Sequence, residues 1–253
     1  MKMKFYKSLA FLCIIGTVVS HATLSAQNKE LKVLFVGNSY TYGNNLSHIV
    51  SIISEGTQTK LVTRKSVAGG AYMWEHWKGS RGLKTRELIA SGKFDIVILQ
   101  DYSMSASNTP DSTYKYVELF TAFNSEHGAE TYLFNTWARK KVPQFQAEID
   151  DVYLRAALAN NITLVPVGPA WELAQGLRHS VELFTSDGSH PNSLGTLLTA
   201  CVFVKTITGE LPERLPTSFI IKDGEGETVR LMQLDNLDGE FCLRVTSQVC
   251  DSL

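Results

Sequence analysis

The sequence predicts a three-layer α/β/α sandwich built around a five-stranded parallel sheet. Short, continuously apolar runs alternate with amphipathic segments through residues 31–209, and no internal repeat or low-complexity tract interrupts them. Strands that are apolar on both faces are covered on both sides, and a helix between successive strands makes the strands parallel. The chain has 253 residues, 44% of them hydrophobic, which is enough for a sizeable core.

Each element follows from its own pattern. The expected strands are LKVLFVG (31–37), KLVTRKSV (60–67), DIVILQ (95–100), ETYLFNT (130–136) and ITLVPVG (162–168). Between them, apolar residues at helical spacing predict helices around 46–53, 116–123 and 145–156, and the largely apolar stretch 193–208 predicts a deeply packed helix. We expect a flavodoxin-like strand order. From 216 onward the pattern is less clear, and residues 229–250 fit either one or two short helices or a hairpin.

Residues 1–26 have the features of a secretory signal peptide. Three lysines precede an apolar run at 9–19 that is too short to span a bilayer, and small residues follow up to Ser25-Ala26. We expect cleavage after Ala26 and export to the periplasm or the cell exterior, with no stable membrane insertion afterwards. A single domain of residues 27–253 is then expected, with 216–253 as a C-terminal extension.

Charge and cysteine content exclude several classes of function. The formal net charge is −1, and removal of three of the 24 basic residues with the signal leaves −4, so neither nucleic acid nor an anionic membrane is an expected partner. The four cysteines form neither a CxxC pair nor a Cys/His cluster at zinc spacing, and we expect no metal and no cofactor. Cys201 is expected in the core, whereas Cys242 and Cys250 are close enough in sequence to pair, a pairing that the pattern leaves open.

Polar groups follow every expected strand. In open α/β sheets the ligand crevice lies at the carboxyl ends of the strands, so these groups are expected to converge. They are Ser39 after the first strand, Gly69-Gly70 after the second, Gln100-Asp101 after the third, Asn135-Thr136-Trp137 after the fourth, and SDGSHPNSLG (186–195) after the fifth strand and a further helix.

Three of these residues suit nucleophilic catalysis. A serine nucleophile needs a base within hydrogen-bond reach and a third group that orients the base. Asp187 and His190 are three residues apart and can share one turn, with one imidazole nitrogen left for Ser39. The alternatives are a helix cap or Asx-turn for Asp187, a surface histidine for His190 and a capping hydroxyl for Ser39. The segment is not a GxSxG elbow, because Thr41 replaces the second glycine.

Together these motifs resemble the SGNH, or GDSL, hydrolases of the secreted bacterial type. VGNSYTYG is similar to the first block of that family, SVAGGA to the second, and DGSHPN to the last, across roughly residues 31–209. The resemblance implies the SGNH hydrolase strand order and a triad of Ser39 as nucleophile, His190 as general base and Asp187 as its orienting partner. It also implies an oxyanion hole formed by the Gly69 amide, with Gly70 as the near alternative, and the Ser39 amide.

The third block departs from the family pattern. Gly-x-Asn-Asp is usual there, with the asparagine side chain as a further oxyanion donor, but this sequence has VILQDYSMS. Gln100 is the expected substitute, and Asn38 and Asn135 are weaker candidates. The alternative for Gln100 is a structural glutamine that binds backbone groups at the end of the sheet.

Aromatic residues gather at the same strand ends and suggest a sugar ligand. Rings beside a polar crevice suit stacking on a pyranose, although aromatic residues are also ordinary core material. The substrate-binding candidates are Tyr40, Tyr72, Trp74, Tyr102 and Trp137.

The resemblance therefore implies an exported serine esterase that removes a short acyl group, acetyl first of all, from a carbohydrate. The expected ligand is accordingly a small-molecule or glycan ester. A lipid esterase or thioesterase on the same scaffold is an alternative. A glycan-binding relative without turnover is another, favoured by the altered third block. Retention of Ser39, Asp187 and His190 together favours an enzyme, because binding alone has no chemical need for all three.

Overall fold

The structure is a computed structural model and describes residues 29–252, so the expected signal peptide lies outside the described residues. A parallel sheet of five strands has the order β2-β1-β3-β4-β5. The strands are β1 (Lys29–Gly37), β2 (Thr59–Val67), β3 (Ile96–Leu99), β4 (Glu130–Asn135) and β5 (Thr163–Pro166). All five expected strands are present, and the flavodoxin-like order is confirmed.

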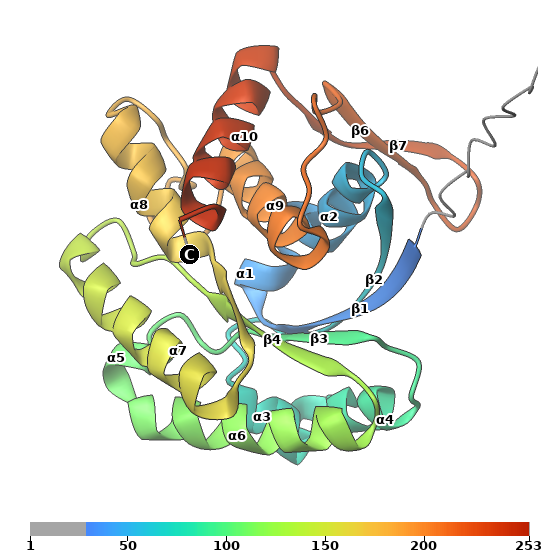
Figure 1. Cartoon of the computed structure of the whole chain (residues 1–253), viewed down its shortest axis with the longest axis vertical. Coiled ribbons are helices and arrows are strands. Elements are labelled where there is room, and N and C mark those ends of the chain that lie inside the picture. The colour runs from blue at the N-terminus through green and yellow to red at the C-terminus, as the bar shows by residue number, and fades with distance from the viewer. Residues whose placement is uncertain (1–28, 253) are drawn as a thin grey trace, which may run out of the picture.

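Helices cover both faces of this sheet and make the three layers of the sandwich (Figure 1). On one face lie α2 (Leu46–Ser54), α8 (Val167–Leu177), α9 (Ser193–Thr208) and α10 (Asn236–Cys250). On the other face lie α3 (Met73–Lys78), α4 (Thr85–Ala90), α5 (Ser105–Asn108), α6 (Pro110–Glu126) and α7 (Gln146–Asn160). The fold class predicted from the sequence is confirmed.

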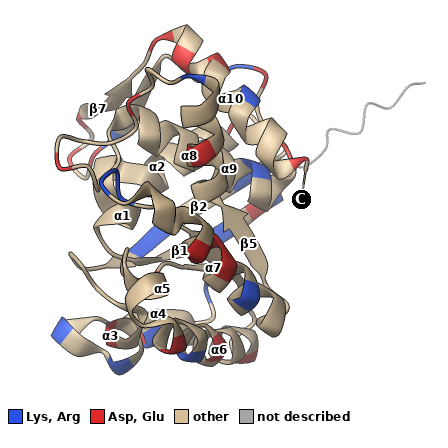
Figure 2. Ribbon diagram, turned by 90° about the vertical axis from the view of Figure 1, so that its left-hand side faces the viewer, with Lys and Arg blue, Asp and Glu red and all other residues tan. Residues whose placement is uncertain are grey.

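Basic and acidic residues are interspersed along the ribbon (Figure 2). Several form surface pairs within one helix or between neighbouring segments, such as Arg155 with Asp151 and Arg178 with Asp238. Exposed pairs of this kind contribute about 0–1 kcal/mol each, so they do not determine the fold. Among residues 29–252, no helix combines the length and the apolarity that crossing a bilayer would require.

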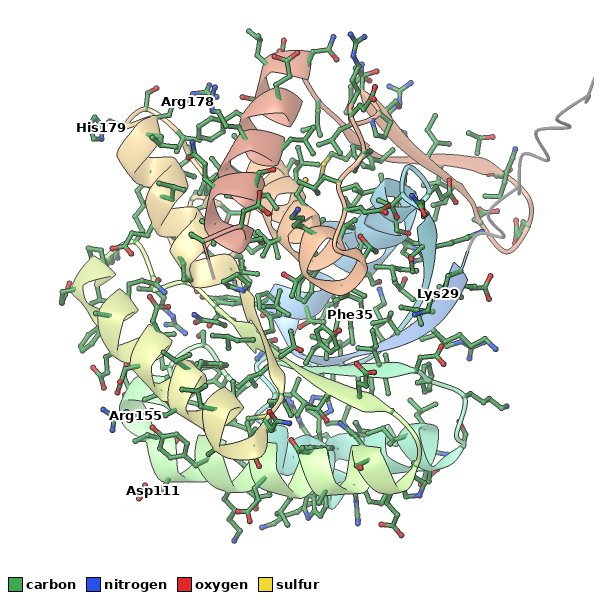
Figure 3. All side chains as sticks on the ribbon, in the orientation of Figure 1. Lys29, Phe35, Asp111, Arg155, Arg178 and His179 are labelled. Atoms are coloured by element: carbon green, nitrogen blue, oxygen red, sulfur yellow. The ribbon has the colours of Figure 1, made fainter. Side chains whose placement is uncertain are left out.

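The core is divided by the sheet into two apolar layers. Successive strand residues point to opposite faces, so Phe35 packs with α9, and its neighbours Leu34 and Val36 pack with the helices of the other face. Figure 3 shows Phe35 at the centre of the molecule, while charged residues such as Asp111 and Arg155 lie at its periphery. Cys201 of α9 is fully buried as expected, and all three cysteines of the described chain are free, including Cys242 and Cys250.

The C-terminal segment forms a hairpin followed by a helix. Strands β6 (Ser218–Lys222) and β7 (Thr228–Gln233) pair antiparallel around the turn-rich DGEGE sequence. Phe219 and Met232 of the hairpin and Phe241 of α10 join the core layer beside α9. Of the arrangements that the sequence left open, the hairpin and a single helix occur together.

Candidate active site

The turn that carries Ser39, residues 37–42, follows β1 and is called the nucleophile turn here after the role expected for Ser39. Gly37 ends the strand, and Asn38 is the N-cap of the four-residue helix α1 (Ser39–Tyr42), because its side-chain oxygen accepts from the Tyr40 amide. The capping role that the sequence allowed for Ser39 is therefore taken by Asn38. The Ser39 hydroxyl stays outside the capping interactions.

His190 and Asp187 form a hydrogen-bonded line with Ser39. His190 Nε2 lies 2.8 Å from Ser39 Oγ, and His190 Nδ1 lies 2.5 Å from Asp187 Oδ2. With Nδ1–H donating to the carboxylate, Nε2 carries the free lone pair and accepts from the serine hydroxyl. This is the hydrogen-bond pattern of a serine nucleophile with its general base and orienting acid.

Asp187 also holds the backbone of the loop that carries His190. Its Oδ1 accepts from the Ser189 and His190 amides, at 2.8 and 2.9 Å, and from the Thr185 hydroxyl. The Asx-turn offered as an alternative is thus present in the same residue that orients the imidazole. These donors, the His190 side chain first, hold the pKa of Asp187 well below its usual range, so the carboxylate is charged throughout the neutral and mildly acidic range.

A stack of three aromatic rings packs against the loop that carries Asp187 and His190. Tyr40 stacks on Trp137, which stacks on Trp171, with ring centroids 4.6 and 3.9 Å apart. Trp137 Nε1 donates to the Ser189 carbonyl, and the Tyr40 and Ser189 hydroxyls lie 2.7 Å apart. The edge of the Tyr40 ring meets His190.

This stack corrects two of the expected substrate contacts. Tyr40 and Trp137 are 2% and 1% exposed, so their faces are covered by other rings and offer no surface to a sugar. A sequence pattern places aromatic residues at strand ends but does not say whether their side chains point inward. Trp171, in contrast, is buried as its apolar surroundings in the sequence indicated.

The second loop brings glycine amides to the nucleophile turn. Gly37 pairs with Val67 in the parallel ladder, so the residues after each strand are neighbours. Asn38 Nδ2 donates to the Ala71 carbonyl, and a Cβ at Gly69 would lie 3.3 Å from the Tyr42 hydroxyl. Among the described residues, the Ser39 and Gly69 amides have no hydrogen-bond acceptor. Gly70 has φ +64°, a left-handed conformation that favours glycine.

Solved structures with this architecture belong to ester hydrolases and their relatives. A DUF4886 family protein from Bacteroides uniformis superposes with a TM-score of 0.70 at 16% identity, over 88% of this chain and 95% of the other. A protein from Slackia heliotrinireducens that is provisionally assigned to the SGNH hydrolases gives 0.58 at 21% identity, over 71% and 100%. The chain has the fold of the SGNH hydrolases.

Other structures with this fold include an acetyl-xylooligosaccharide esterase from Geobacillus, which matches with a TM-score of 0.56 at 13% identity, over 73% of this chain and 97% of the other. No family model and no curated protein matches the sequence. The likeness to the SGNH hydrolases is therefore a likeness of fold.

Within this SGNH fold, the third block is used differently from the expectation. Gln100 is fully buried, and its Oε1 accepts from the Asn38 amide and the Thr41 hydroxyl, at 3.0 and 2.9 Å, while its Nε2 donates to the Asp101 carbonyl. Its carboxamide therefore holds the nucleophile turn from inside and does not face a substrate, which corrects its expected role as an oxyanion donor. A side chain at Gly37 would collide with this carboxamide. The contacts of Gln100 are those of the alternative given above, a structural glutamine that binds backbone groups at the end of the sheet.

The weaker asparagine candidates are also engaged in structural contacts. Asn38 Nδ2 donates to the Ala71 and Asp101 carbonyls and so joins three strand-end loops. Asn135 donates to Asp150 on α7 and is fully buried. Neither amide is free to face a substrate.

Asn44, which the sequence analysis did not single out, and Asp101, noted there only as a polar residue after the third strand, also contact the segments around the expected triad. Asn44 Nδ2 donates to the Pro191 carbonyl at 2.8 Å, which ties the nucleophile turn to the residue after His190. Asn44 and Asn45 both have positive φ, a conformation in which asparagine is enriched. The buried carboxylate of Asp101 accepts from the Met73 and Tyr102 amides and from the Thr113 hydroxyl. Burial is the main cause of its raised pKa.

His76 anchors the end of the nucleophile strand. Its ring is fully buried, with Nε2 3.0 Å from the Gly37 carbonyl and Nδ1 2.7 Å from the Thr85 hydroxyl, which in turn contacts Ser66. A carbonyl can only accept, so Nε2 carries a proton, and in the neutral ring Nδ1 accepts from the Thr85 hydroxyl. Burial is the main cause that lowers the pKa of His76 to about 4.

We expect this histidine to make the fold acid-sensitive. Between pH 6.5 and pH 4 the unfolded chain binds a proton that the folded ring does not, so the free energy of unfolding falls as the pH falls, by about 3 kcal/mol from this group. Urea unfolding at pH 7.5, 5.5 and 4 measures the slope of the free energy of unfolding against pH. His76→Gln should reduce this slope. His179→Gln, at an exposed histidine, is the control and should keep the wild-type slope. An unchanged slope in His76→Gln would contradict this account.

The remaining aromatic candidates form an exposed wall. Tyr72 and Trp74 are partly exposed, and Tyr72 lies 4.6 Å from Tyr102 between ring centroids. Tyr72 follows Ala71, and Tyr102 follows Asp101, the two residues whose carbonyls bind Asn38. These three rings therefore keep the expected position beside the nucleophile turn.

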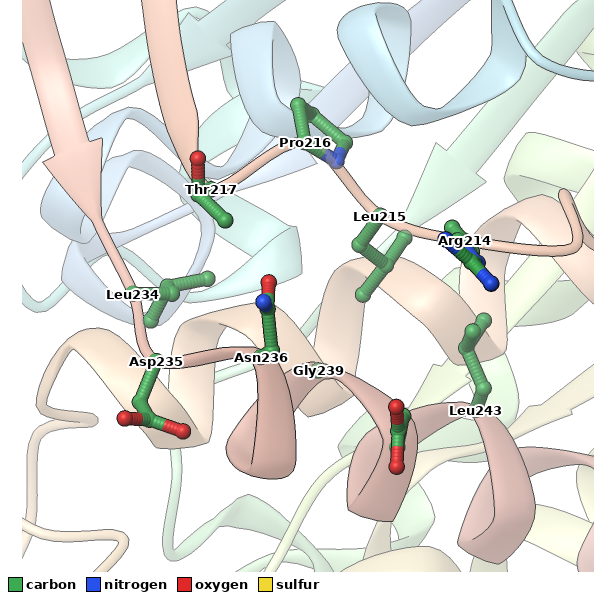
Figure 4. Close-up of a pocket in the computed structure, with 10 residues that line it drawn as sticks. Arg214, Leu215, Pro216, Thr217, Leu234, Asp235, Asn236, Gly239 and Leu243 are labelled. Atoms are coloured by element: carbon green, nitrogen blue, oxygen red, sulfur yellow. The ribbon is translucent and has the colours of Figure 1, made fainter.

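A separate pocket of about 220 Å³ lies between the C-terminal hairpin and α10 (Figure 4). Arg214, Asp235 and Glu240 contribute charges of both signs to its wall. None of the predicted site residues lines it. Among residues 29–252, no group of three His, Cys, Asp or Glu side chains is placed to hold a metal ion.

Proposed function

We propose that this protein is an exported serine esterase that removes short acyl groups, acetyl first of all, from a carbohydrate substrate. The observation that carries the proposal is the continuous hydrogen-bonded line from Ser39 Oγ through His190 to Asp187. A serine hydroxyl is a weak nucleophile without such a base, and a binding protein has no chemical use for the arrangement.

The geometry supports a two-step acyl transfer. Ser39 Oγ attacks the ester carbonyl while His190 Nε2 takes the serine proton, and the Asp187 carboxylate stabilises the imidazolium that forms. The tetrahedral oxyanion accepts from the Ser39 and Gly69 amides. When the ester bond breaks, His190 returns the proton to the departing sugar hydroxyl. Water then attacks the acyl-enzyme with His190 again as base, and the acid is released.

Three observations support the acetyl and carbohydrate parts of the proposal. The wall of Tyr72, Trp74 and Tyr102 offers partly exposed rings to a sugar face. Proteins of the same fold include an acetyl xylan esterase and an acetyl-xylooligosaccharide esterase. The basic and apolar segments at residues 1–26 fit export, where such substrates are met.

The test combines a chemical probe with a series of reporter esters. A fluorophosphonate reacts with an activated serine whatever its acyl specificity, so we expect mass spectrometry to find it on the peptide that contains Ser39. Residues 27–253 should hydrolyse p-nitrophenyl acetate faster than the butyrate or the octanoate. If the reaction with acetate is stopped with acid during turnover, mass spectrometry should find an acetyl group on the same serine. A preference for octanoate would favour the lipid esterase, and no labelling at all would favour the glycan-binding alternative.

A further inference from the structure

Arg139 carries a positive charge that no acidic residue neutralises. It lies in the loop after β4, is half-buried, and forms no ion pair with an Asp or Glu of the described residues. The nearby acids have other partners: Lys140 pairs with Glu182, and Asp187 is held by His190. A half-buried cation without a counter-ion gives up hydration for no compensating charge, which is costly unless a ligand supplies the anion.

The contacts of Arg139 fix its side chain but leave one end of the guanidinium free. Nη2 donates to the Tyr102 and Ser103 hydroxyls, at 3.1 and 2.8 Å, and the guanidinium lies over the Tyr102 ring. Nε is buried without a partner. Nη1 has no hydrogen-bond acceptor among residues 29–252 and is not buried. The acceptors are neutral hydroxyls, so the charge is positioned and remains unpaired.

The same contacts place Arg139 beside the catalytic groups. Ser103 accepts from the guanidinium, and the guanidinium opposes the rise that burial causes in the pKa of Tyr40, whose hydroxyl lies 2.7 Å from that of Ser189. Tyr40 follows the nucleophile, and Ser189 precedes the general base. The neighbouring Lys140 amide also donates to the Gly188 carbonyl in the catalytic loop.

We propose that Arg139 binds a carboxylate on the sugar that carries the ester or on its neighbour, so that the preferred substrate is an acylated acidic glycan. This inference rests on the proposed esterase function and specifies its substrate class. The sugar ring lies against Tyr102 and Tyr72, and its carboxylate accepts from Nη1. Arginine suits this task because its charge is permanent and its donors are fixed in a plane.

Binding of simple glycosides separates this inference from the question of turnover. We expect Ser39→Ala, which cannot consume an ester, to bind methyl glucuronide roughly 10- to 100-fold more tightly than methyl glucoside, as a charge-assisted hydrogen bond allows. Adding Arg139→Gln should remove this difference. Adding Arg155→Gln, at a surface arginine paired within α7, is the matched control and should preserve it.

Kinetics of matched acetyl esters give the second readout. The ratio of kcat/KM for an acetylated methyl glucuronide over the acetylated methyl glucoside should fall by the same factor in Arg139→Gln, and Arg139→Lys should restore part of it. Equal binding of the two glycosides by the Ser39→Ala protein would overturn the inference, whatever the esterase assays show. A sulfated neutral glycoside that binds as tightly as the glucuronide would overturn the assignment of a carboxylate. Hydrolysis of p-nitrophenyl acetate by the wild type tests the esterase function separately.

Discussion

Replacing Ser39 with alanine is expected to reduce kcat for ester hydrolysis by about 10⁴-fold or more. The substitution removes the only atom that can form the acyl-enzyme, and the loss of a nucleophile from a working triad has effects of this size. The fold should be retained, because the side-chain hydroxyl contacts only His190 among the described residues. Initial rates with p-nitrophenyl acetate and the circular dichroism spectrum of each protein are the measurements.

The matched control is Ser125→Ala, which removes an exposed serine hydroxyl from α6. It should keep the wild-type rate. If Ser39→Ala kept more than about a tenth of the wild-type kcat while other variants of the site lost activity, another group would be the nucleophile. The mechanism proposed above would then be incorrect.

Replacing Asp187 with asparagine is expected to lower kcat by about 10²–10⁴-fold. An asparagine amide can donate to Nδ1 and so stabilise the tautomer in which Nε2 carries the proton, and that tautomer cannot accept from Ser39. The lower part of the range is favoured because the Asp187 side chain is half-exposed, so water replaces part of its stabilisation of the imidazolium. The pre-steady-state rate of Ser39 acylation measures the effect directly.

Asp187 also makes a small pH-dependent contribution to stability. Hydrogen bonds in the folded state depress its pKa, so its contribution is complete above the unfolded pKa of about 4 and is lost as the pH falls through the folded value. The difference in free energy of unfolding between wild type and Asp187→Asn should therefore shrink as the pH falls below about 4. Asp151→Asn, on the surface of α7, is the control for general charge loss and should keep full activity. An unchanged acylation rate in Asp187→Asn would show that the carboxylate does not orient the base.

The layers of the fold could be predicted because they depend on patterns that single segments carry. Five apolar runs and the amphipathic stripes between them define a covered parallel sheet, and the ends of the strands then define one edge. Ser39 and His190 meet across 151 positions of sequence because both follow elements of that sheet. The fifth strand shows the limit, since it ends at Pro166 rather than at 168, and α8 begins directly after it at Val167.

The direction of side chains could not be predicted in the same way. Gln100 stands where an oxyanion donor was expected. Because Gly37 has no side chain, there is room beneath the nucleophile turn, and the Gln100 carboxamide fills that space. Tyr40 and Trp137 turn inward because Trp171, on a helix 34 positions later in the sequence than Trp137, presents a ring for them to stack on. The direction of each of these side chains depends on three segments of the chain at once, so a local sequence pattern does not predict it.

The stack of Tyr40, Trp137 and Trp171 has a consequence for how a protein of this kind can diversify. The loop that carries His190 packs on rings that belong to the core, whereas Tyr72 and Arg139 lie in loops and Trp74 lies in the first turn of α3, all three partly exposed. Substitution of these exposed residues is expected to change which substrate binds without moving Ser39 or His190. A protein with this arrangement can therefore acquire new substrates by single substitutions among the exposed residues, while selection keeps Ser39, His190 and the rings beneath them unchanged.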